Sequence, residues 1–229
     1  HDLSGLLEAC LEGIQLALEA APAGIVVAAH INFGDAVWFQ DGPEDGLALF
    51  RQAAEIGDRR GAVSNANWAR MESQWPLFDL GRWDELVTIA DGLLARFEDR
   101  MQIAVLTETF RQLVLVNRGI LDGAPMIEER VLPRAREIDD GQVVVPAFRL
   151  AAMARSALGD RSGAIALVDE AAGLIRERPG LRGWLLDDSA RLCLSAGEPG
   201  VIRTLLEEFT PRVTRARLSK LGAEAALAE

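Results

Sequence analysis

The sequence predicts an all-α protein, a solenoid of antiparallel helix hairpins, and two observations carry this prediction. Apolar residues recur three or four positions apart along nearly the whole chain, which is the spacing of one face of an α-helix. Glycine recurs where a helix would end, and charged residues or proline then open the next helix. These corner glycines are Gly42, Gly81, Gly123, Gly159 and Gly197, separated by 39, 42, 36 and 38 residues. A repeat in this range is typical of stacked helical hairpins.

The clearest corner is the stretch Leu-Gly-Arg-Trp-Asp-Glu-Leu at residues 80–86. Gly81 stands where the chain leaves a helix in the left-handed conformation, which costs glycine less than any other residue. Asp84 and Glu85 then place negative charge in the first turn of the next helix, where the helix dipole favours it. This stretch therefore predicts a tight turn between two antiparallel helices.

Helix boundaries follow from the apolar spacing and from proline and glycine. Pro76 lies inside one periodic segment and predicts a break near residues 74–76, because proline removes a backbone donor. The segment 57–61, Gly-Asp-Arg-Arg-Gly, is expected to be a turn between hairpins. The valine run at 143–145 resembles a strand but is closed by Pro146, so we expect a helix there. The predicted helices are 3–20, 24–40, 43–56, 62–80, 82–97, 101–121, 124–138, 144–158, 161–176, 181–196, 198–209 and 214–229.

The composition of the chain argues against a nucleic-acid-binding protein and against a membrane-spanning one. The chain has 229 residues, 49% of them hydrophobic, and a net charge of −11, which is typical of a folded protein and argues against a nucleic-acid surface. No apolar run is long enough to span a bilayer. Cys10 and Cys193 lie in apolar helical contexts, so we expect a reduced, cytoplasmic protein. We expect a single domain over residues 1–229, and the first residue, His1, suggests a fragment of a longer protein.

With the corner glycines aligned, the segments resemble degenerate tetratricopeptide repeats. Seven residues before the glycine, where that family packs a small residue, stand Ala152 and Ala190. Five and twelve residues after Gly159 stand Ala164 and Ala171, which the family also prefers. The family also has an aromatic residue two positions after the glycine, and among the aligned segments Trp83 alone matches it. This resemblance implies a right-handed α-α superhelix, a TPR-like solenoid.

The chain is also similar to helical regions that follow the ATPase module in large bacterial regulators of the adenylate/guanylate-cyclase type and the LuxR or AfsR type. Those regions carry corners like residues 80–85, turns like residues 57–61 and helices like Ala-Ala-Leu-Ala-Glu at 225–229. The resemblance implies a partner-binding or sensing arm within a signalling or transcription regulator. Enzymatic or DNA-binding parts would then lie outside this chain.

No catalytic signature is present in the sequence. A phosphate-binding Walker loop needs a Gly-Lys-Ser/Thr step, and Lys220, the one lysine, lies between Ser219 and Leu221. His30 has no second histidine near it in the sequence and is interpreted as a structural residue. Adjacent acids such as Asp139 and Asp140 point about 100° apart on a helix, so they do not form an acid/base pair. We therefore expect no catalytic residue, no metal site and no cofactor.

The remaining function class is binding. In TPR-type solenoids the first helix of each hairpin lines the concave surface, and we take the residues ten and six positions before each corner glycine as lining it. Their polar side chains suit a peptide backbone or a charged peptide end, and one tryptophan suits an anchor. The candidate binding residues are Asn32, Trp75, Asn117, Arg149, Asp187 and Arg191. Ordinary solvated surface remains the alternative interpretation of these positions.

Two functions are compatible with this pattern. The first is a non-catalytic helical-repeat scaffold that binds a protein or peptide partner, such as another domain of the same protein, and neither nucleic acid nor membrane. The alternative is a small-molecule sensor arm of a nucleotide cyclase or an ATPase-containing regulator. That alternative needs an enclosed apolar cavity among Trp38, Trp68, Trp75 and Trp83, which are otherwise expected to be core residues.

Overall fold

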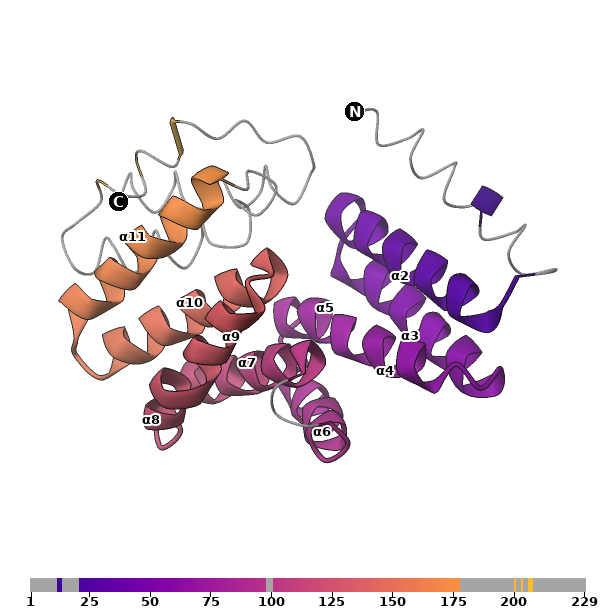
Figure 1. Cartoon of the computed structure of the whole chain (residues 1–229), viewed down its shortest axis with the longest axis horizontal. Coiled ribbons are helices and arrows are strands. Elements are labelled where there is room, and N and C mark those ends of the chain that lie inside the picture. Colours follow the sequence, from indigo (N-terminus) through magenta and orange to yellow (C-terminus); the bar gives the residue numbers. More distant parts are fainter. Residues whose placement is uncertain are drawn as a thin grey trace. The chain divides into compact units, whose positions relative to one another are not determined.

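The computed structural model describes residues 12–13, 21–97, 101–177, 200, 203 and 206–207. This part of the chain is entirely helical and contains no strand, so the predicted all-α class is confirmed for it (Figure 1). The chain divides into two compact units, residues 1–96 and 97–229, which are described separately here. The helices predicted at 3–20, 181–196, 198–209 and 214–229 lie almost wholly outside the described residues.

The first unit contains five described helices. They are α2 (Ala23–Gln40), α3 (Pro43–Arg59), α4 (Val63–Glu72), α5 (Gln74–Asp79) and α6 (Trp83–Leu94). The break predicted near Pro76 is confirmed, because α4 ends at Glu72 and α5 begins after Ser73. Pro76 is the third residue of α5, and its missing N–H therefore falls in a first turn, where no intrahelical partner exists.

Helices α2 and α3 form a close antiparallel hairpin. A Cβ added to Gly46 would lie 2.5 Å from the Cβ of Trp38, and one added to Gly34 would lie 2.8 Å from the Phe50 ring. Both contacts join positions equally far from the turn at Asp41 and Gly42, as expected for antiparallel helices. Gly42 has a φ of 126°, so this corner glycine takes the positive φ that the sequence predicted.

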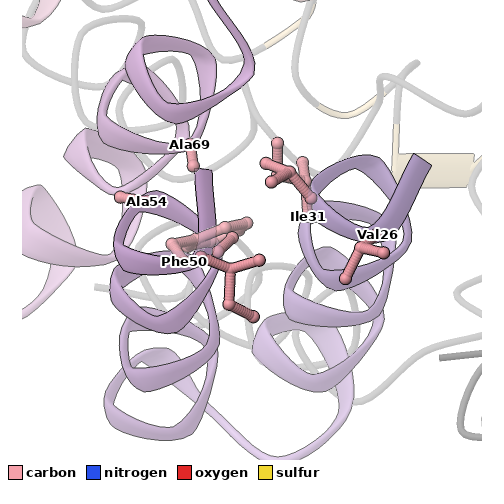
Figure 2. Close-up of a cluster of buried hydrophobic side chains, with 8 residues drawn as sticks. Val26, Ile31, Phe50, Ala54 and Ala69 are labelled. Atoms are coloured by element: carbon pink, nitrogen blue, oxygen red, sulfur yellow. The ribbon is translucent and has the colours of Figure 1, made fainter. Parts of the chain in front are cut away.

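The core of the first unit lies where α2, α3 and α4 meet. Figure 2 shows Val26 and Ile31 from α2 facing Phe50 from α3, with Ala54 and Ala69 beside them. Phe50 is fully buried. Helix α4 contributes the small, fully buried side chain of Ala69, and Trp68 from the same helix packs against this core.

The turn predicted at residues 57–61 is shorter than expected. Helix α3 continues to Arg59, and the turn is made around Gly61, which has a φ of 75°. Gly57 is a packing residue instead, because a Cβ at that position would lie 2.8 Å from the Cβ of Ala66 on α4. The absence of a side chain at Gly57 therefore lets α3 and α4 approach closely.

The second unit contains α7 (Gln102–Asn117), α8 (Ala124–Met126), the π-helical turn η1 (Ile127–Val131), α9 (Leu132–Ile138), α10 (Gly141–Ala157) and α11 (Arg161–Glu177). The prediction of a helix to residue 121 with its corner at Gly123 is wrong. Gly119 has a φ of 75°, whereas Gly123 has a φ of −82°. The N–H of Ile120 bonds the carbonyl of Leu115 at 2.9 Å, which closes the helix around Gly119.

With Gly119 in place of Gly123, the described corner glycines are more evenly spaced than predicted. Gly42, Gly81, Gly119 and Gly159 all have positive φ and are separated by 39, 38 and 40 residues. Gly197 lies outside the described residues. The corrected spacing strengthens the repeat pattern, since each described corner now has a glycine with positive φ.

Two further boundaries differ from the sequence prediction. The segment predicted as one helix over 124–138 contains η1, in which the N–H of Leu132 bonds the carbonyl of Ile127, five residues back. Pro133 follows at once, and its missing N–H accounts for the locally widened helix. Helix α10 begins before the predicted residue 144, because the Asp140 carboxylate accepts the N–H of Gln142 at 2.8 Å and caps the helix.

No helix in the described ranges combines the length and the apolar character needed to cross a membrane.

Candidate functional site

The structure places four of the six predicted binding residues, and they do not share one environment. Asn32 is exposed on α2, and Asn117 is exposed at the end of α7, where its amide donates to the Leu113 carbonyl of its own helix at 2.7 Å. Arg149 is half-buried on α10. Asp187 and Arg191 lie outside the described residues.

Trp75 is a core residue of the first unit. It is 6% exposed, and its ring lies 5.7 Å from the ring of Trp38, which is also buried. The Trp38 indole N–H donates to the Asp79 carboxylate at 3.0 Å, which satisfies the one polar group of that side chain. Trp75 therefore offers little surface to a partner, and its main role is packing between α2 and α5.

The first helices of neighbouring hairpins run parallel within each unit. In the second unit the Gln102 amide at the start of α7 donates to Asp140 at the start of α10, 38 residues further on, at 3.1 Å. In the first unit the Asn65 amide on α4 donates to the Gly24 carbonyl on α2 at 3.4 Å, across 41 residues. Both bonds join helix starts that are about one repeat apart, so equivalent positions of adjacent hairpins lie near each other.

Half-buried positions on α7 and α10 form a narrow stripe, which we call the α7/α10 stripe. Its members recur three or four residues apart on each helix, and the rest of both helices between their first and last turns is buried. The stripe consists of Glu108, Arg111 and Leu115 on α7 and of Arg149 and Met153 on α10. The 38-residue register makes Arg149 the equivalent of Arg111, and Met153 the equivalent of Leu115.

Glu108 and Arg111 are paired within the stripe. Glu108 accepts a hydrogen bond from the Gln112 amide at 2.7 Å and lies 3.6 Å from the Arg111 guanidinium. Sequence reasoning missed Glu108 and Arg111 because they lie at neither of the two counted offsets, ten and six residues, from Gly123 or from Gly119. The available signal was an acid and a base three residues apart inside an otherwise apolar helix. The stripe combines two guanidinium groups with two aliphatic side chains.

Ion pairs join the second helices of neighbouring hairpins. Arg51 on α3 pairs with Glu85 on α6, and Arg136 on α9 makes two bonds of 2.8 Å to Glu170 on α11. Each pair spans 34 residues. Burial raises the pKa of Glu85, but hydrogen bonds and charges from Arg51 and Arg82 outweigh it and lower this pKa below its usual value. These pairs link the second helices of adjacent hairpins at the same spacing in both units.

Among the described acidic residues, Asp35 on α2 has the largest shift in pKa. Burial raises its pKa from 3.8 to about 7, because the surrounding protein disfavours the charged form. His30, one turn earlier, is 2% exposed and shares a hydrogen bond of 2.8 Å with the Val26 carbonyl, as the structural interpretation of that histidine requires. Neither residue belongs to the α7/α10 stripe.

A second polar cluster joins α3, α4 and the end of α6. The Asn67 side-chain oxygen accepts bonds from Arg70 at 3.3 Å and from Arg96 at 3.4 Å, and Arg70 also pairs with Asp58. Asn67 is 4% exposed, whereas Arg96 is exposed. Among the described residues, no group of three or more histidine, cysteine or acidic side chains is arranged to hold a metal ion.

Comparison with known proteins does not assign the chain to a family. No protein-family model matches the chain, and no curated protein matches it.

Proposed function

We propose that this chain is a non-catalytic helical-repeat scaffold that binds a protein or peptide in the cytoplasm, as an arm of a bacterial signalling or transcription regulator. The proposal includes a right-handed superhelix of stacked hairpins. It is supported by the hydrogen bonds and ion pairs between elements roughly one repeat apart, and by the even spacing of four corner glycines with positive φ.

The observation that carries the binding role is the α7/α10 stripe. Parallel first helices of two hairpins present equivalent positions side by side, and here those positions carry Arg111 and Arg149 with Leu115 and Met153. Guanidinium groups bind carboxylates through paired N–H donors, and the aliphatic groups accept apolar side chains. The partner that fits is a short peptide with acidic and aliphatic residues, whose carboxylates compete with Glu108 for Arg111.

Selection from a displayed peptide library tests this proposal. We expect the chain to enrich acidic, aliphatic peptides, and the variant Arg111→Ala with Arg149→Ala to bind them about tenfold or more weakly, since a hydrogen bond to a charged group contributes about 1.5–3 kcal/mol. Arg59→Ala is the matched control, because Arg59 is exposed and pairs with Glu55 one turn away on α3. Equal binding by the double variant and the parent would rule out the stripe.

The alternative of a small-molecule sensor arm has less support. It needs a cavity among the tryptophans, but Trp38 and Trp75 pack against each other and Trp68 packs on the core of the first unit. The Trp83 ring stacks on Phe78, and its N–H donates to the Phe78 carbonyl at 3.2 Å. These contacts favour packing roles for all four side chains.

A further inference from the structure

Two guanidinium groups converge on one neutral oxygen in the first unit. Arg70 on α4 and Arg96, just after α6, both donate to the side-chain oxygen of Asn67, at 3.3 and 3.4 Å. Both bonds are longer than a typical hydrogen bond between nitrogen and oxygen. Asn67 is buried on α4, while both arginines reach solvent.

The charges at this cluster do not balance. Asp58 pairs with Arg70, but in the described part of the chain Arg96 contacts no carboxylate. Among the described side chains, two positive groups are thus held close together with one negative group, in a chain whose net charge is −11. A guanidinium has five N–H donors, and Arg96 uses one nitrogen in its bond to Asn67. The cluster therefore has both the charge and the spare donors to bind an anion.

We propose that Arg70, Arg96 and Asn67 form a binding site for a phosphate group. A planar carboxylate offers two oxygens and is satisfied by one guanidinium fork, whereas a phosphate group offers three or four oxygens to forks that arrive from two directions. The anion takes the place between the two arginines and offsets their repulsion. Asp58 competes for Arg70, so the affinity for a free anion falls in the millimolar range. This site is separate from the α7/α10 stripe, and either proposal stands without the other.

Titration of isotope-labelled protein with inorganic phosphate, followed by NMR at constant ionic strength, tests the site. We expect saturable shifts of the backbone amides around Asn67, Arg70 and Arg96, with glycerol 3-phosphate as a second probe for a phosphate attached to a larger molecule. Arg96→Gln should weaken binding about tenfold, as expected for the loss of one charge-assisted interaction of about 1.4 kcal/mol. Arg59→Gln, which removes an exposed arginine from the same region, should bind as the parent does.

Arg96 is exposed, so Arg96→Gln should fold normally, and an unchanged circular dichroism spectrum checks this. Stronger binding of the monoester than of inorganic phosphate supports a phosphorylated partner or metabolite, and the reverse supports free phosphate. Three results overturn the proposal: no saturable shift with either probe, equal binding by Arg96→Gln and the parent, or acetate acting as strongly as phosphate at the same ionic strength.

Discussion

Single glycines decide how closely the helices of the first hairpin approach. Gly46 faces the Cβ of Trp38, and Gly34 faces the ring of Phe50, so a side chain at either position has no room. The sequence shows both glycines inside apolar periodic segments, where they look like weak points of a helix. Their packing role depends on which residues lie opposite, and that information comes only from the tertiary structure.

Gly46→Ala should therefore destabilise the chain by about 1–3 kcal/mol, because the added methyl group overlaps Trp38. Gly92→Ala is the control. Gly92 lies in α6 with no atom within 4 Å of an added Cβ, so alanine should stabilise that helix by about 0.5–1 kcal/mol. Urea unfolding of both variants measures the difference. A neutral Gly46→Ala would contradict the close packing of α2 on α3.

Asp35 makes stability depend on pH. Its pKa in the folded chain is raised from 3.8 to about 7, so the folded state binds more protons than the unfolded state between these values. Stability should fall as pH rises from about 4 to about 7 and stay low above that range. Asp35→Asn removes this dependence, and near pH 8 it should be more stable than the parent by up to about 4 kcal/mol.

Thermal unfolding of Asp35→Asn at a series of pH values checks that expectation. Asp122→Asn is the matched control, since Asp122 is exposed in the segment between α7 and α8. If the parent and Asp35→Asn show the same dependence on pH, burial does not shift the protonation of Asp35 in the way described.

At the scale of elements, the helices were largely predictable because their signals are local. Apolar spacing predicted α2, α3, α6 and α11 within a few residues, and Pro76 predicted the break between α4 and α5. The misses have physical reasons. Gly57 lies inside α3 as a packing residue, where the missing side chain makes room for Ala66, and η1 arises from the local effect of Pro133 on hydrogen bonding. Neither effect is visible in periodicity.

The choice between Gly119 and Gly123 as the corner is a test at this scale. Gly119→Ala should cost about 1–2 kcal/mol, because its φ of 75° strains any residue with a Cβ. Gly123→Ala meets the end of the flexible Gln112 side chain, which can move, so its cost should be smaller. Denaturant unfolding ranks the two variants. A larger loss of stability for Gly123→Ala than for Gly119→Ala would support Gly123 as the corner, as the sequence predicted.

At the scale of the whole molecule, the binding surface was less predictable than the fold. Counting from corner glycines selected Arg149, which belongs to the α7/α10 stripe, but also Trp75, which is buried, and Asn117, which bonds its own helix. The rule failed because its offsets do not select the exposed face: Trp75 was counted from Gly81, which is a true corner, and counting from Gly119 selects Thr109 and Leu113, which are buried. Glu108 and Arg111 were recognised as part of the α7/α10 stripe only from their exposure in the structure and from the register between α7 and α10.

We propose that successive hairpins stack, each stabilised mainly by its neighbours. Hydrogen exchange measured by mass spectrometry on Phe50→Ala tests it most directly, because Phe50 is fully buried in the first unit. We predict that α2, α3 and α4 lose protection while α9, α10 and α11 keep that of the parent. Equal loss of protection in all of these helices would contradict the stacked-hairpin account.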